Sequence, residues 1–242
     1  VCGMLIAKLC DRGPGSAVYS ELQRRIQIFS EEHVEQLVAL LEHDVARRYS
    51  SLLLEGFFEE MRKRSSHLQI KSVAQLLALL KHHDGVTRLE ALNLLEGSLR
   101  KGLLLPNTIE LLAESLTEVA PTFTMIGKPL AFSCLVLCGK HAKHSVDMLM
   151  HNLKDEDSSV RLAALKAVLK LGSSTRATQV IELALADSSA SVRLALVECA
   201  EELDDTQCKA TLQALAKDSD LFVQRAACRA LGCSLPKRRR VN

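Results

Sequence analysis

The chain has 242 residues, of which 48% are hydrophobic and 3% aromatic, and it contains no Trp. This composition favours helices packed on helices and argues against a β-rich core. The formal net charge of +2 is too close to balance to indicate, by itself, a nucleic-acid or membrane surface.

The first part of the chain, residues 1–30, is predicted to be a partial or capping segment with a linker. Residues 1–10 are interpreted as the remnant of a preceding helix, and the DRGPGS stretch that follows predicts a turn. The apolar start is too short for a secretory signal and runs into charged residues. No apolar run approaches the roughly 20 residues of a membrane helix, so no membrane association is expected.

From residue 31 the apolar residues recur with helical spacing, in successive helix pairs. In the first pair, Val34, Leu37, Val38 and Leu41 mark one face at i, i+3, i+4 and i+7. The second helix of this pair is predicted to run from after Asp44 to about residue 64. The next pair is predicted over residues 70–80 and 84–99.

A third pair is predicted to begin at Pro106, and its second helix to run from near Pro129 to His141. The intervening residues 119–129 are predicted to form a loop. Three further pairs follow, so about six pairs account for residues 31–234. Residues 235–242 form a basic C-terminal tail.

The last three pairs contain a clear internal repeat. The segments DEDSSVRLAALKAVLKLG, DSSASVRLALVECAEEL and DSDLFVQRAACRALG align at Val160, Val192 and Val223, with spacings of 32 and 31 residues. A fixed period in this range is typical of a solenoid, in which each unit buries its apolar faces against its neighbours.

The pattern Asp-x-x-Val-Arg, followed by small residues and Leu, resembles the second helix of a HEAT repeat, one of the armadillo-like helical repeats. The resemblance implies an all-α, right-handed superhelical solenoid with the second helices on its concave side. It points to a family of repeats and to no individual protein.

Arginines recur at one position of these second helices. Arg161 and Arg193 occupy equivalent buried-facing positions, and Arg88 matches them in an earlier pair. A charge in such a place must be paired. We therefore predict a structural arginine ladder whose members pair with turn acids such as Asp155, Asp157 and Asp187.

Two adjacent His-Asp pairs, His43-Asp44 and His83-Asp84, lie 40 residues apart in matching turns. Some hydroxylases that resemble HEAT proteins hold two irons with His-Glu pairs, whereas the acid here is Asp. The alternative, which we favour, is that each Asp caps the following helix beside a solvent-exposed His.

A second set, Cys134, Cys138, His141 and His144, contains zinc-ligand residue types. The first three span about 10 Å along one predicted helix, which is too long to close a tetrahedral shell. Buried packing by the two cysteines is the favoured interpretation. We therefore predict no metal and no cofactor.

Enzymatic signatures are not recognisable. The chain shows no nucleophile elbow, no catalytic Cys signature and no Gly-rich phosphate loop. The eight cysteines have no framework spacing, which indicates reduced thiols in an intracellular protein. We expect a non-enzymatic protein of the cytoplasm, with the nucleus as a second location if the tail acts as an import signal.

The tail sequence Pro-Lys-Arg-Arg-Arg-Val resembles a monopartite nuclear-import signal, which implies an import receptor as partner. The alternative is a basic tail that only improves solubility. The four cations concerned are Lys237, Arg238, Arg239 and Arg240.

Helical-repeat DNA glycosylases offer another resemblance, but they use a basic concave face. Here the aligned solvent positions carry charges of alternating sign, so nucleic acid is disfavoured as the main ligand. These positions are Lys166, Glu198 and Arg229, then Lys170, Glu202 and Cys233.

The sequence thus favours a non-catalytic scaffold or adaptor that binds a protein partner along its repeat surface. The predicted partner-binding residues are Lys166, Glu198, Glu202 and Arg229. The alternatives are a nucleic-acid-associated module that uses the basic tail and a metal-dependent repeat enzyme that uses the His-Asp turns.

Overall fold

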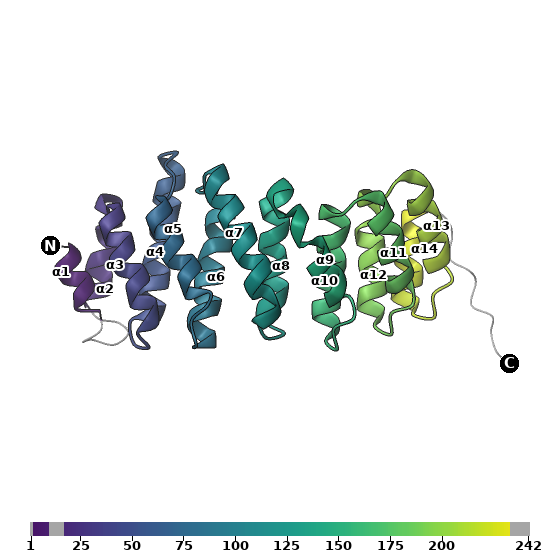
Figure 1. Ribbon diagram of the computed structural model, residues 1–242, viewed down its shortest axis with the longest axis horizontal. Coiled ribbons are helices and arrows are strands. Elements are labelled where there is room, and N and C mark those ends of the chain that lie inside the picture. Colours follow the sequence, from purple (N-terminus) through teal and green to yellow (C-terminus); the bar gives the residue numbers. More distant parts are fainter. Residues whose placement is uncertain (1, 10–16, 233–242) are drawn as a thin grey trace. The chain divides into compact units, whose positions relative to one another are not determined.

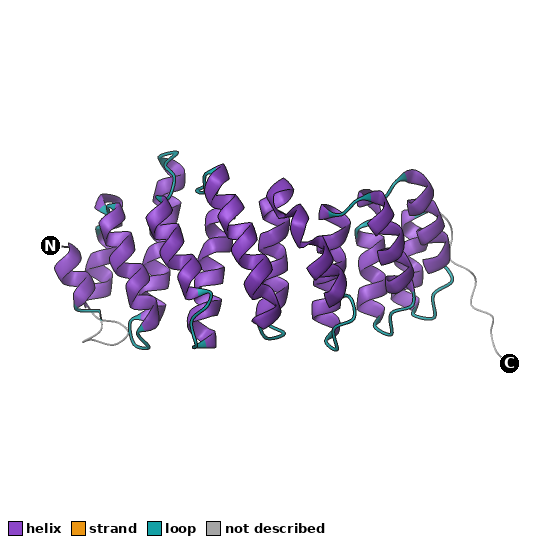
Figure 2. Ribbon diagram, in the orientation of Figure 1, coloured by secondary structure: helices purple, strands orange, loops and turns teal. Residues whose placement is uncertain are grey.

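The computed structural model describes residues 2–9 and 17–232, and every regular element in these residues is helical (Figures 1 and 2). Its internal contacts divide the chain into two compact units, Val1–Ala142 and Lys143–Asn242. The sequence-based boundaries at residues 30 and 234 remain predictions, and the division after residue 142 was not among them.

The described residues of unit 1 form four successive helix pairs in two layers. The first helices, α1, α3, α5 and α7, pack on one another in order, and the second helices, α2, α4, α6 and α8, do the same. Their bounds are α1 Cys2–Ala7, α2 Ala17–Arg24, α3 Glu31–Ala39, α4 Arg47–Lys63, α5 Ile70–Leu79, α6 Gly85–Arg100, α7 Pro106–Val119 and α8 Gly127–Cys138.

Unit 2, as described up to residue 232, contains three further pairs. The second helices α10, α12 and α14 pack in sequence, and α11 packs on α13 in the other layer. Their bounds are α9 Val146–Asn152, α10 Ser158–Leu171, α11 Ser174–Leu185, α12 Ala190–Glu198, α13 Asp205–Leu215 and α14 Leu221–Ala230. Short 3-10 turns supplement the helices at Ile26–Ile28, Leu40–Glu42, Ala120–Thr122, Gly139–Ser145 and Ala200–Glu202.

The core of unit 1 follows directly from the repeat. Leu53 of α4 recurs as Leu94 of α6 and as Cys134 of α8, each at most 1% exposed. The preceding and following turns repeat the same alternation of buried and exposed positions. Each second helix therefore buries one side against its neighbours and leaves a narrow stripe in solvent, as expected of stacked helical repeats.

The all-α, solenoid-type stacking predicted from the sequence is confirmed, whereas its handedness remains a prediction. The estimate of about six pairs leaves out α1 and α2. Those two helices occupy part of the segment interpreted as a helix remnant and linker, and they pack on α3 and α4. Residues 10–16 and the basic tail lie outside the described residues.

The loop predicted for residues 119–129 is present but shorter, since it covers residues 120–126. Helix α7 continues to Val119, a 3-10 turn covers Ala120–Thr122, and α8 already begins at Gly127. Phe123 is buried in the turn, and a Cβ at Gly127 would lie 2.6 Å from its Cδ1 atom. Glycine at this position therefore permits the close approach of the Phe123 ring to the start of α8.

The prediction that α8 extends to His141 is wrong. Helix α8 ends at Cys138, because Gly139 adopts a positive φ of 57° and the chain continues as a 3-10 turn rather than as an α-helix to His141. Within the described residues, no helix has the length and apolarity needed to span a membrane.

Candidate functional site

The arginine ladder of unit 2 joins each helix pair to the next. The guanidinium of Arg161 donates two hydrogen bonds, both of 2.8 Å, to the two carboxylate oxygens of Asp187. Its remaining nitrogen donates to the backbone carbonyls of Asp155 and Glu156, both at 2.9 Å. Burial acts to raise the pKa of Asp187, but the bonds from Arg161 and from the Ser189 amide outweigh it and lower the pKa.

Arg193 repeats this arrangement one helix pair later. It donates to both carboxylate oxygens of Asp218, at 2.7 and 2.9 Å, and to the carbonyl of Asp187 at 2.8 Å. The hydrogen bond from Arg193 is the main cause of the lowered pKa of Asp218. The equivalent position of α14 is occupied by Gln224. The backbone carbonyls of Asp155 and Asp187 thus accept hydrogen bonds from the arginine of their own repeat. The carboxylates of Asp187 and Asp218 accept hydrogen bonds from the arginine of the preceding repeat.

In unit 1 the ladder takes a different form. Arg88 donates to the Leu80 carbonyl at 2.9 Å and to the Thr122 hydroxyl at 2.5 Å, and its guanidinium carbon lies 4.3 Å from the centre of the Phe123 ring. Thr122 and Phe123 therefore take the place of the turn acid predicted as its partner. A cation over an aromatic ring supplies part of the missing attraction.

Sequence reasoning missed Arg47, which occupies the ladder position of α4. It donates to the Leu41 carbonyl at 2.8 Å and lies 2.9 Å from Asp44 and 3.0 Å from Asp84. Its side chain is 12% exposed. The signal was the spacing of 41 residues between Arg47 and Arg88, close to the spacing of the two His-Asp turns.

The two His-Asp turns have unlike structures. Asp84 caps α6, since its carboxylate accepts from the backbone amide of Thr87 at 2.9 Å and from its hydroxyl at 2.7 Å. Asp44 does not cap α4, whose N-cap is Ala46, and its side chain is 91% exposed. The cap interpretation therefore holds for the second turn and is wrong for the first.

The Asp84 cap makes a testable prediction. The hydroxyl and amide of Thr87 are the main causes that lower the pKa of Asp84 from 3.8 to about 2. Because this pKa is depressed, the stabilisation by the carboxylate is present above its unfolded pKa and is lost as the pH falls towards 2. Thr87→Val should move the Asp84 midpoint upwards, as followed by NMR titration of the carboxyl carbons.

An internal control is available in the same spectra. The carboxyl of Asp157, whose pKa is lowered chiefly by Ser159, lies in unit 2 and should keep its midpoint in the Thr87→Val protein. An unchanged Asp84 midpoint would show that Thr87 does not hold the carboxylate in solution.

The second zinc-like set does not gather into a cluster. Within the described residues, no group of three or more His, Cys, Asp or Glu side chains is placed to hold a metal ion. Cys134 and Cys138 are buried, and burial raises the pKa of the Cys134 thiol well above its usual value and that of Cys138 to about 12. Both cysteines are thus held as thiols within the core, where they fill space.

The predicted partner-binding residues lie on the second helices of unit 2. Lys166 of α10 contacts Glu198 of α12 at 2.7 Å, and Lys170 lies 3.7 Å from Glu202 in the following turn. These pairs are about half exposed, and Arg229 of α14 is exposed. The structure therefore brings three of the four predicted residues into paired rows and places Arg229 beyond them. The tail residues Lys237, Arg238, Arg239 and Arg240 lie outside the described residues.

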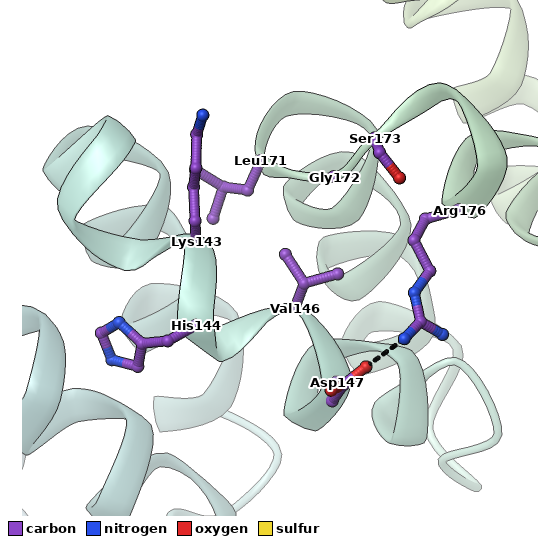
Figure 3. A pocket seen from close by; sticks show the side chains of 8 residues that line it. All are labelled: Lys143, His144, Val146, Asp147, Leu171, Gly172, Ser173 and Arg176. Carbon is purple, nitrogen blue, oxygen red and sulfur yellow. Dashed lines mark hydrogen bonds and ion pairs between the residues drawn. The ribbon is translucent and has the colours of Figure 1, made fainter.

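Unit 2 also contains a cleft of about 360 Å³ between the start of α9 and the α10–α11 turn (Figure 3). Arg176 and Asp147 point towards each other across it, 2.6 Å apart, whereas Lys143 and His144 point in other directions. Because the polar groups do not converge on one point, the cleft lacks the arrangement expected of a small-molecule site. It is lined by Lys143, His144, Val146, Asp147, Leu171, Gly172, Ser173 and Arg176.

The second helices of unit 1 expose a different set of side chains at the same positions. Where unit 2 has Lys166 and Glu198, α4, α6 and α8 have Leu52, Asn93 and Ser133. One turn later, Gly56, Gly97 and Leu137 replace the charged row that contains Lys170 and Glu202. Unit 1 therefore carries an uncharged strip where unit 2 carries paired charges.

Comparison with known proteins identifies the repeat. Residues 146–174 match a model described as HEAT repeat, and residues 177–238 match one described as HEAT repeats. No curated protein sequence matches the chain. Among solved structures, it is similar to the archaeal HEAT-like repeats protein from Thermococcus onnurineus NA1, with 10% identity, 95% of each chain covered and a TM-score of 0.59.

The chain is also similar to the complex of CpcE and CpcF of phycocyanin lyase from Nostoc sp. PCC7120, with 17% identity, 96% of this chain and 92% of that chain covered, and a TM-score of 0.47. The family matches in unit 2, the repeated Asp-Arg connections and the archaeal neighbour agree with one another. The part of the chain between residues 146 and 238 therefore contains HEAT repeats, and the likeness to the archaeal structure is one of fold.

Proposed function

We propose that the chain is a non-catalytic scaffold or adaptor that binds a protein partner along its second helices. The observation that carries this proposal is the recurring exposed position of those helices. Leu52, Asn93 and Ser133 in unit 1, and Lys166 and Glu198 in unit 2, remain exposed or half-buried at equivalent places. Within each unit, such a regularly spaced row of side chains suits contact with an extended protein surface.

The charges of the same rows favour protein over nucleic acid as the ligand. Lys166 and Lys170 each face a glutamate of the next helix, so their positive charge is locally offset. A nucleic-acid ligand would instead favour a continuous basic strip that neutralises successive phosphates. Binding through the basic tail is the alternative, and it is separated from the leading proposal by the experiment below.

An intracellular location belongs to the same proposal. The cysteines of the described residues, from Cys2 to Cys228, are all free thiols. Free thiols suit a reducing compartment. Entry into the nucleus would depend on the tail acting as an import signal.

The test is an affinity pull-down from cell extract with mass spectrometry, comparing the full chain with a chain that ends at Leu235. Proteins captured in stoichiometric amounts by both chains would support binding through the repeat surface. If the full chain captured only import receptors or nucleic-acid complexes, and the shortened chain captured none of them, the scaffold proposal would be overturned.

A further inference from the structure

The packing of α6 does not require a glycine at position 97, which lies inside the helix. A Cβ atom built at Gly97 would have no heavy atom within 4 Å, whereas a Cβ at Gly56, the equivalent position of α4, would lie 2.7 Å from Cδ1 of Ile26. Glycine inside a helix is unfavourable relative to alanine. At Gly97, however, the missing side chain leaves the helix backbone accessible to a binding partner.

Gly97 belongs to a surface that we call the α6–α8 face and define as the uncharged residues Asn93, Gly97, Ser133 and Leu137, with the Glu96–Arg100 ion pair at its margin. The Ser133 hydroxyl donates to Glu96 at 3.3 Å, so α8 passes directly beside the turn of α6 that contains Gly97. Leu137 follows one turn later on α8 and is 37% exposed, and Asn93 precedes Gly97 by one turn and is exposed.

Positive charge gathers where these second helices end. The ends of α4 and α6 and the two residues that follow α8 contain six cations, three of which pair with acids: Arg62 with Glu59, Lys63 with Glu60 and Arg100 with Glu96. The turns that follow α4 and α6 lie on the same edge of unit 1 (Figure 1). The cations beyond these three acid pairs are Arg64, Lys101 and Lys140.

Lys101 lies close to the end of α4 as well as to α6. Its positive charge, after the stronger effect of the hydrogen bond from Arg62, contributes to lowering the pKa of Glu59. The ends of α4 and α6 therefore place positive charges near one another on this edge, at the end of the α6–α8 face where Leu137 lies. An uncharged face with a basic border is complementary to a segment that carries both apolar and acidic side chains.

We infer that the α6–α8 face binds an extended acidic segment of a protein partner. The backbone of the segment passes close over Gly97, an apolar side chain lies against Leu137, and its carboxylates face Lys101 and Lys140. This inference rests on the proposed protein-binding function, and it names the part of the surface and the chemistry of the partner.

The experiment uses the full chain and a phage-displayed library of random peptides as the probe. The enriched peptides should combine Asp or Glu with an aliphatic residue, and their affinity should fall with added salt. The consensus peptide is then synthesised with a fluorescent label and titrated by anisotropy. Gly97→Glu, which adds both bulk and negative charge to the face, should weaken binding by roughly tenfold or more.

Gly85→Ala is the matched control. Gly85 belongs to the same helix, and a Cβ there also has no heavy atom within 4 Å, but it lies at the opposite end of α6 from the basic edge. Its peptide affinity should equal that of the parent. Both variants, together with Gly97→Ala, should melt at or above the temperature of the parent, which shows that a loss of binding is not a loss of folding.

Two results would overturn the inference: enriched peptides that are basic or uncharged, or equal affinities for Gly97→Glu and Gly85→Ala. Failure of the broader proposal is distinguishable. If Gly97→Glu captures the same stoichiometric partner from extract as the parent, the scaffold function stands and the α6–α8 face is excluded as its site. If neither the parent nor the variants capture a partner or enrich a peptide, both proposals fall.

Discussion

Replacing Asp187 by Ala is expected to lower the free energy of unfolding by about 2–4 kcal/mol, because it leaves the Arg161 guanidinium without its carboxylate. The two side chains are 13% and 8% exposed, and they are joined by two hydrogen bonds of 2.8 Å. The same substitution removes the acceptor of the Ser189 amide, at 2.8 Å, which holds the turn before α12. Urea unfolding monitored by circular dichroism gives the change.

The control is an exposed ion pair between α10 and α12. Glu198→Ala cuts the 2.7 Å contact with Lys166, whose side chain is 41% exposed against 55% for Glu198. Pairs of this kind contribute up to about 1 kcal/mol. A loss for Asp187→Ala no larger than that for Glu198→Ala would contradict a structural role for the ladder.

The second large effect is expected in the core beneath the α6–α8 face. Phe132 of α8 is 1% exposed and is among the largest fully buried side chains. Phe132→Ala leaves a cavity that the surrounding helices cannot fully close, and it should cost about 3–5 kcal/mol. The same unfolding measurement applies, with the midpoint and the slope both recorded so that a change in compactness is recognised.

Phe222 provides the comparison, since it has the same side chain at the start of α14 and is 73% exposed. Phe222→Ala should change the free energy of unfolding by no more than about 0.5 kcal/mol. Similar losses for the two variants would mean that the burial of Phe132 does not describe the protein in solution.

The helical stacking could be read from the sequence because the apolar spacing is determined by burial within each pair. The pairing of Arg161 with Asp187 could be anticipated for a similar reason, since a cation in a buried-facing position needs an acid from the nearest turn. Arg88 could not be treated in the same way. The turn that it reaches supplies Thr122 and Phe123, and only the structure shows that a hydroxyl and a ring replace the carboxylate there.

The two His-Asp turns show that the same short motif can stand at different distances from the start of a helix. Asp84 precedes Arg88 by four residues and reaches the first amides of α6, whereas Asp44 precedes Arg47 by three and falls outside the capping position. The two His-Asp motifs have the same amino-acid sequence. Their different roles depend on the helix start, which is the least predictable feature of a repeat.

The candidate binding surface was only partly readable. The alternation of Lys166 and Glu198 is visible from their spacing of 32 residues, but the open space above Gly97 is a property of the packed helices. A glycine in a helical pattern does not reveal whether a neighbour or a ligand needs the room, as the contrast with Gly56 demonstrates.

The ladder has a consequence for how such a chain can change its length. Residues 187–217 begin with the carboxylate that receives one arginine and contain the next arginine, Arg193, which reaches forward to Asp218. An in-frame tandem duplication of this stretch would therefore present each arginine with a carboxylate, as in the existing Arg161–Asp187 and Arg193–Asp218 pairs. One repeat carries both the acid and the arginine of the connection, so the chain can be lengthened by whole repeats without losing an Arg–Asp pair.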